Sequence, residues 1–174
     1  MVSPASTPGE GCTTPGACVC GPREDVNTMS FALSRLECER FLAETHVGVF
    51  SVTEEGRGPL SVPIWYRYEP RGDIVMVTPQ TSRKIPLLQK SGRGGFCVQD
   101  ERPPFRYVSV EGSVRIDKVD TEPIVREAAI RYLGRARGEK YVKMTAADRA
   151  HEVVVRLTPK RWFSADFESL IPSA

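Results

Sequence analysis

The chain has 174 residues, which is enough for one domain with a proper hydrophobic core and too few for two domains of ordinary size. Its 24 basic and 22 acidic side chains nearly cancel, so the net charge of +2 provides no general field that would attract nucleic acid or an anionic membrane. Neither a signal peptide nor an apolar run approaching the roughly 20 residues of a membrane-spanning helix is present in the sequence.

The first 28 residues predict a disordered tail. They contain four Pro, four Gly and almost no large apolar side chain, so they cannot bury enough surface to offset the entropy lost on ordering. Three cysteines lie in this tail without a neighbouring histidine, and we expect free thiols rather than a four-ligand zinc site at Cys12, Cys18 and Cys20. The odd total of five cysteines argues against a disulfide framework and predicts a cytoplasmic protein.

The folded domain is expected over residues 29–174, with Met29 as an alternative start of translation. Its first element is a short helix that begins after Ser34, because Ser34 and Glu37 have the spacing of a capping box and apolar residues follow.

Three strands are expected next. The runs "VGVFSVT" (47–53) and "LSVPIWYRY" (60–68) alternate or are rich in β-branched residues, and "EEGRG" between them is typical of a hairpin loop. After the turn "EPRGD", the run 73–78 supplies a third antiparallel strand.

The segment "VTPQTSRKIPLLQK" places Arg83 and Lys84 side by side at the start of a helix, directly after a strand that stops at Thr78. Cations at this end of a helix are disfavoured by roughly 0.3–1 kcal/mol each. A bound phosphate would reverse that effect, because free backbone N–H groups and the hydroxyls of Thr78, Thr81 and Ser82 add donors. The segment therefore predicts a phosphate site; the alternative is an ordinary helix with two solvent-exposed cations.

Further strands at 94–100 and 106–116, a helix at 121–136 and two closing strands, "HEVVVRL" and "RWFSADF", complete the pattern. Short strands with turn signals and few helices favour a small barrel over a parallel sheet. We expect a mainly β (α+β) fold, a six- to seven-stranded antiparallel split β-barrel.

The order strand, "T-x-x-x-S-R-K", helix, strand, with "VPIWY" one strand earlier, resembles the pyridoxamine 5'-phosphate oxidase-like family, the split-barrel flavin and deazaflavin oxidoreductases. The likeness covers about residues 33–166. It implies that the terminal phosphate of the cofactor is held by Thr78, Ser82, Arg83 and Lys84. It also implies that the edge of the isoalloxazine ring is lined by Val62, Pro63, Ile64 and Trp65. Gln99 is expected near the ring or the ribityl chain.

The same resemblance implies a homodimer with two cofactors at its interface, each touched by both chains. The segments "RYVSVEG" and "RWFSADF" are similar to those that the neighbouring chain contributes, with Tyr107, Ser109 and Trp162 as candidates. For Tyr107 and Trp162 the alternative is packing without ligand contact, since aromatic residues serve both purposes.

The implied activity is hydride transfer to or from a small organic substrate, and no catalytic side chain is assigned because a flavin carries the redox chemistry itself. FMN is the expected cofactor. The alternative is the deazaflavin F420, whose acidic tail would need further basic residues such as Arg93, Arg102 and Arg106. The chain lacks the C-terminal "R-x-H-like" substrate-phosphate region of true pyridoxamine phosphate oxidases, so vitamin oxidation is disfavoured and the substrate is unassigned.

Two other classes stay open. The same barrel could hold a flavin or haem as a non-catalytic binding or carrier protein. A nucleic-acid-binding barrel is suggested by "GRGG" and by arginines next to aromatics, but the balanced, scattered charges argue against it. We therefore expect a small-molecule substrate, no nucleic-acid partner and no membrane partner.

Overall fold

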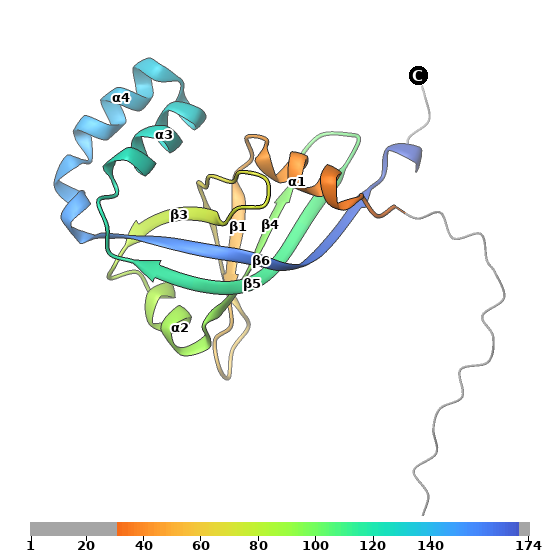
Figure 1. Cartoon of the computed structure of the whole chain (residues 1–174), viewed down its shortest axis with the longest axis horizontal. Coiled ribbons are helices and arrows are strands. Elements are labelled where there is room, and N and C mark those ends of the chain that lie inside the picture. The colour runs from red at the N-terminus through yellow and green to blue at the C-terminus, as the bar shows by residue number, and fades with distance from the viewer. Residues whose placement is uncertain (1–30, 171–174) are drawn as a thin grey trace, which may run out of the picture. The chain divides into compact units, whose positions relative to one another are not determined.

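A computed structural model describes residues 31–170 of the chain. The expected tail at 1–28, its three cysteines and the alternative start at Met29 lie outside the described residues. Six strands form one sheet in the order β2-β1-β4-β5-β6-β3, and every neighbouring pair is antiparallel (Figure 1). The mainly β fold that the sequence predicts is confirmed.

The elements follow one another as α1 (Arg35–Ala43), β1 (Gly48–Val52), β2 (Leu60–Ile64), β3 (Ile74–Pro79), α2 (Lys84–Ser91), β4 (Arg93–Gln99), β5 (Arg106–Asp117), α3 (Glu122–Leu133), α4 (Arg135–Met144), the 3₁₀ helix η1 (Ala146–His151), β6 (Glu152–Asp166) and the 3₁₀ helix η2 (Glu168–Leu170). None of the helices within residues 31–170 is long and apolar enough to cross a membrane.

Helix α1 begins as its sequence predicts. The hydroxyl of Ser34 accepts a hydrogen bond from the backbone N–H of Glu37 (3.3 Å), and the Glu37 carboxylate accepts one from the backbone N–H of Ser34 (2.8 Å). This reciprocal capping box satisfies two N–H groups that would otherwise have no partner at the helix start.

The sheet curls until its two edge strands, β2 and β3, approach each other. The predicted strand at 60–68 is shorter in the structure, because Ile64 pairs with Gly48, the first residue of β1, and no further partner follows. The chain then crosses towards β3, where Arg67 and Val75 exchange two backbone hydrogen bonds of 2.9 and 2.8 Å. The result is a half-barrel whose edges meet at one bridge.

The prediction of two closing strands is wrong in one respect, because both segments belong to the single 15-residue strand β6. The partners of Glu111 and Gly112 on β6 lie two residues apart, which leaves Lys160 as the extra residue of a β-bulge. A Cβ atom at Gly112 would lie 1.9 Å from the backbone oxygen of Thr158, so only glycine fits where the strands cross so closely. The bulge bends β6 without ending it.

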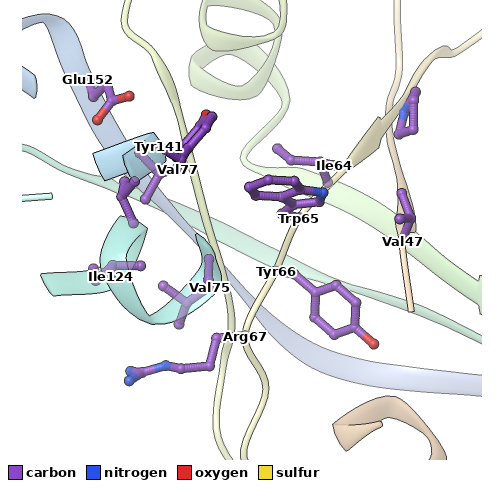
Figure 2. A pocket seen from close by; sticks show the side chains of 13 residues that line it. Val47, Ile64, Trp65, Tyr66, Arg67, Val75, Val77, Ile124, Tyr141 and Glu152 are labelled. Atoms are coloured by element: carbon purple, nitrogen blue, oxygen red, sulfur yellow. The ribbon is translucent and has the colours of Figure 1, made fainter. Parts of the chain in front are cut away.

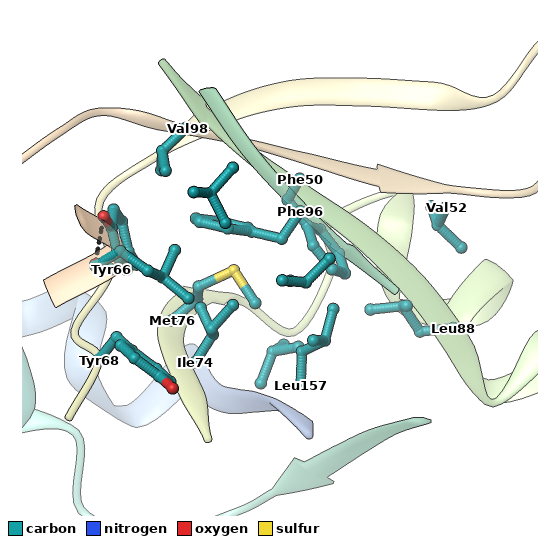
Figure 3. Packing of buried hydrophobic residues seen from close by; sticks show 14 of the residues in the cluster. Phe50, Val52, Tyr66, Tyr68, Ile74, Met76, Leu88, Phe96, Val98 and Leu157 are labelled. Atoms are coloured by element: carbon teal, nitrogen blue, oxygen red, sulfur yellow. Dashed lines mark hydrogen bonds between the residues drawn. The ribbon is translucent and has the colours of Figure 1, made fainter. Parts of the chain in front are cut away.

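The hydrophobic core fills the inside of the curled sheet (Figure 3). Side chains from several strands meet there almost without solvent exposure, including Phe50, Met76, Phe96, Val110 and Leu157. Strand residues that alternate with these point outwards, as the period of two in a strand requires.

The helix predicted at 121–136 is interrupted. Helix α3 ends at Leu133, and Gly134, with φ +76° and ψ 162°, redirects the chain into α4. Helix α4 was not predicted from the sequence because four of its ten residues are Lys or Arg, and three of its four apolar residues are confined to its last turn. Gly138 allows the two helices to pack closely, because a Cβ atom there would lie 2.8 Å from the Cα atom of Ile130.

Candidate functional site

Three of the predicted phosphate ligands meet where β3 ends and α2 begins. The Nζ atom of Lys84 donates hydrogen bonds to the hydroxyls of Thr78 (2.8 Å) and Ser82 (2.7 Å). We call Thr78, Ser82 and Lys84 the cradle. Among residues 31–170 no carboxylate forms an ion pair with Lys84, and partial burial lowers the pKa of its ammonium group. The cradle thus holds a positive charge without a countercharge.

The backbone around the cradle adds further donors. The N–H of Ser82 donates to the carbonyl of Pro79 (3.0 Å) and that of Ile85 to the carbonyl of Ser82 (2.9 Å). Within the described residues, the N–H groups of Arg83 and Lys84 between them have no such acceptor, and no side chain caps this end of α2. Free N–H groups beside an uncompensated ammonium form an arrangement that suits an anion.

Arg83 does not join the cradle. Its guanidinium forms an ion pair with Glu54, which lies in the hairpin loop between β1 and β2. The Arg83 side chain is 52% exposed, so this pair is a surface contact of the kind that contributes only about 0–1 kcal/mol. A phosphate in the cradle would compete with Glu54 for Arg83.

A pocket of about 410 Å³ lies between the end of β2, the outer face of β3 and the α3–α4 pair (Figure 2). Three of the four residues predicted at the ring edge line it, namely Pro63, Ile64 and Trp65, whereas Val62 is half-buried in β2 and does not. The indole of Trp65 stacks on Tyr132 with the ring planes 6° apart and the centroids 5.0 Å apart. We call this the helix pocket.

The remaining predicted residues lie elsewhere. Gln99 is exposed at the end of β4 and, with Pro63, lines a groove of about 570 Å³. Tyr107 and Trp162 line a pocket of about 430 Å³ beside α1, where the guanidinium of Arg35 lies 3.8 Å from the centroid of the Trp162 ring. A single chain therefore does not bring these residues to the cradle.

The basic residues that F420 would need are also scattered. Arg106 is engaged by Asp100, with a 2.8 Å ion pair. Arg93 begins β4 and Arg102 follows its other end, so the strand separates them. The three arginines do not form one basic surface.

The chain matches the family described as pyridoxamine 5'-phosphate oxidase over residues 34–163, which is well over half of its length. The chain belongs to this family. The resemblance drawn from "T-x-x-x-S-R-K" and "VPIWY" is thereby confirmed.

Several solved structures share the fold of this chain. A conserved hypothetical protein from Mycobacterium tuberculosis is 21% identical with a TM-score of 0.64, over 84% of this chain and 94% of that one. A protein named F420 reductase is 19% identical with a TM-score of 0.61, over 72% and 94%. The FAD and heme binding protein from Mycobacterium smegmatis is 13% identical with a TM-score of 0.61, over 79% and 73%. Among curated proteins, none matches the sequence significantly. At these identities the likeness concerns the fold.

Two features of this family member were not predicted from its sequence. The pairing of Arg83 with Glu54 joins residues 29 positions apart, and no local pattern signals it. Tyr141 lines the helix pocket from α4, the helix that the sequence did not indicate. In the sequence, Tyr141 is visible only as one apolar residue between lysines.

Proposed function

We propose that the chain binds a flavin-type cofactor through its phosphate and transfers hydride between that cofactor and a small organic substrate. The observation that carries the proposal is the cradle: an ammonium group that has no countercharge among residues 31–170, held between two hydroxyls beside N–H groups that have no acceptor in the same part of the chain. The two hydroxyls give Lys84 hydrogen-bond acceptors but no compensating charge, and burial disfavours its charged form, so a bound anion would stabilise this arrangement. The names of the similar F420 reductase and FAD and heme binding protein support the same class of cofactor.

The cradle suits the phosphate end of such a cofactor. When bound, a flavin supplies the redox chemistry, and the protein contributes binding, orientation and exclusion of water. In this proposal the cradle residues hold the phosphate, and Arg83 exchanges Glu54 for a phosphate oxygen. Val62, Pro63, Ile64 and Trp65 lie along the ring edge, and Gln99 approaches the ring or ribityl chain.

We propose FMN as the cofactor, with F420 as the alternative. FMN ends in a phosphate monoester, which matches a compact site with one free ammonium and two N–H donors. The acidic tail of F420 would gain little here, because Arg106 is already paired with Asp100, while Arg93 begins β4 and Arg102 follows its other end. Because one similar protein is named F420 reductase, the experiment tests F420 as well as FMN.

The deciding experiment is the visible spectrum of the protein purified without added cofactor, followed by titration with FMN and with F420. We expect an oxidised-flavin band, or tight uptake of FMN by the colourless protein. Tight uptake of F420 alone would exchange the cofactor but keep the class. A colourless protein that binds neither compound would refute the proposal.

A non-catalytic binding or carrier protein is the competing function. Reduction of the bound cofactor by NAD(P)H or a reduced deazaflavin, followed by reoxidation that depends on an added substrate, would support an enzyme. A bound cofactor whose redox state never changes under these conditions would favour the carrier.

We also propose a homodimer formed through the outer face of the sheet. Cross-strand partners form one outward row over β1, β4, β5 and β6, consisting of Val49, Cys97, Ser109 and Phe163. Val49 is 42% and Phe163 is 51% exposed, which is unusual for apolar side chains in one continuous row. Ser109 lies on this row and Tyr107 on the same face, so both could reach a neighbouring chain. Trp162 alternates with Phe163 and packs partly against the core.

The dimer is tested by light scattering of Val49→Glu, with Val119→Glu as the matched control. Val119 is also exposed, at 52%, but lies in the loop after β5. We expect a monomer for Val49→Glu and a dimer for Val119→Glu and the unmodified chain. A monomeric unmodified chain would refute the dimer.

A further inference from the structure

The helix pocket is a chamber separate from the cradle. Successive residues of a strand point to opposite faces, so Thr78 shares the inner face of β3 with Met76, whereas Val75 and Val77 face the helix pocket. Figure 2 shows Val75 and Val77 on the pocket side, opposite Trp65. A phosphate in the cradle and a molecule in the helix pocket would therefore contact opposite faces of the same strand.

The walls of the helix pocket are apolar and partly flat. Val77 from β3 and Ile124 and Ala128 from α3 supply aliphatic surface. The rings of Trp65 and Tyr141 supply aromatic surface, with centroids 5.5 Å apart and planes inclined by 52°. The volume of about 410 Å³ falls within the range of roughly 300–1,000 Å³ that is usual for small-molecule sites. Such walls favour a compact, planar ligand.

The charges at the helix pocket are already compensated within the protein. Of residues 31–170, two with charged side chains line it, Arg67 and Glu152. Arg67 forms a 2.7 Å ion pair with Glu127, and the Glu152 carboxylate accepts hydrogen bonds from Arg149 (2.9 Å) and from the hydroxyl of Thr121 (2.8 Å). A charged ligand would lose its hydration without meeting an unpaired countercharge, whereas a neutral ligand would not.

We infer that the helix pocket takes the substrate of this oxidoreductase, and that the substrate is a neutral, flat, largely apolar aromatic molecule. That this ligand is a substrate rests on the proposed function, whereas the preference of the pocket for a neutral aromatic ligand does not. Pro63, Ile64 and Trp65 belong both to the wall of the helix pocket and to the predicted ring edge. A ligand in the pocket would therefore lie next to the ring, as hydride transfer requires.

Three probes with one ring system test the charge preference: neutral 1-naphthol, anionic 1-naphthoate and cationic 1-naphthylmethylamine. Each is titrated calorimetrically into the full chain at neutral pH, with and without saturating FMN. We expect 1-naphthol to bind at least about tenfold more tightly than either charged probe, a difference of about 1.4 kcal/mol. Equal or tighter binding of a charged probe would overturn the inference.

Ala128→Phe fills the helix pocket, and Ala136→Phe makes the same change at an exposed position of α4 outside it. We expect Ala128→Phe to lose 1-naphthol binding while keeping its affinity for FMN, and Ala136→Phe to keep both. If Ala128→Phe has an unchanged circular dichroism spectrum but loses both ligands, the isoalloxazine ring itself fills the pocket and the inference is overturned.

Tyr141→Ala keeps the test open should Ala128→Phe fail to fold, because it removes one aromatic wall from a partly exposed position. It should weaken 1-naphthol binding severalfold and leave FMN binding unchanged; unchanged 1-naphthol binding would overturn the inference. If neither the unmodified protein nor any variant binds FMN or F420 while the naphthol results hold, the proposed function fails and the neutral-ligand site stands.

Discussion

Replacing Lys84 with methionine isolates the contribution of the cradle. Methionine keeps much of the side-chain volume and removes the charge and all three N–H donors. A hydrogen bond to a charged group contributes about 1.5–3 kcal/mol, and each 1.4 kcal/mol corresponds to tenfold in affinity. If Lys84 binds the phosphate as proposed, Lys84→Met should weaken FMN binding by about 10- to 140-fold.

The same substitution should leave the fold nearly unaffected. The lowered pKa of Lys84 means that burial disfavours its charge, so the loss of two hydrogen bonds to Thr78 and Ser82 is offset by relief of that unfavourable charge. We expect the free energy of unfolding of the cofactor-free protein to change by no more than about 1 kcal/mol, as measured by urea denaturation.

Lys90→Met is the matched control, since Lys90 lies on the same helix. Its side chain is 72% exposed and pairs with Glu55 at the surface, so its removal should leave both FMN affinity and stability unchanged. Calorimetric titration of the three proteins decides the matter. Equal FMN affinity in Lys84→Met and Lys90→Met would refute the reasoning, whether both were normal or both were weakened to the same degree.

Three further predictions follow from the same structure. Burial lowers the pKa of Lys84 below the ordinary value of 10.5, so FMN affinity should fall as alkaline pH removes this proton, and Lys84→Arg should shift the fall to higher pH. Because the unfolded chain holds the proton more tightly, the cofactor-free protein should become more stable over the same pH range. An unchanged pH profile of FMN affinity in Lys84→Arg would contradict the assignment. Gly112→Ala should lower the free energy of unfolding by about 1–3 kcal/mol or more, because its Cβ would lie 1.9 Å from a backbone oxygen of β6. Gly58→Ala should be tolerated in the same urea assay, because a Cβ atom there would have no described neighbour within 4 Å. Equal effects of the two substitutions would argue against close strand packing at the bulge. Tyr66→Phe should cost about 1–3 kcal/mol of unfolding free energy by urea denaturation, because the buried hydroxyl donates a 2.8 Å hydrogen bond to the carbonyl of Leu42; a neutral result would show that this carbonyl finds another donor.

The parts of the fold and of the candidate site that the sequence predicted depend on residues close together along the chain. The capping box needs only Ser34 and Glu37. The cradle lies within residues 78–84, so a strand followed at once by a helix is enough to bring its side chains together. In both cases local geometry decides the structure.

The features that sequence reasoning missed depend on distant partners. The sequence predicted two closing strands, but β6 continues from one to the other because β5 supplies a partner on each side of the bulge. The pairing of Arg83 with Glu54 could not be predicted, because Glu54 lies next to Arg83 only after the β1–β2 hairpin has formed. Helix α4 carries too few apolar residues to be seen by periodicity and is held by packing on α3.

The placement of the α3–α4 pair between β5 and β6 has an evolutionary consequence. Asp117 and Val154, on either side of residues 118–151, are direct cross-strand partners, so this stretch enters and leaves the sheet at one point (Figure 1). The α3–α4 pair can be lengthened, shortened or exchanged without disturbing the strand order, and within this stretch it is His151, after both helices, that contacts the turn at the end of β3 by accepting a hydrogen bond from the N–H of Gln80. A lineage built on this scaffold can thus change what it recognises by altering one insert and inherit its chemistry intact.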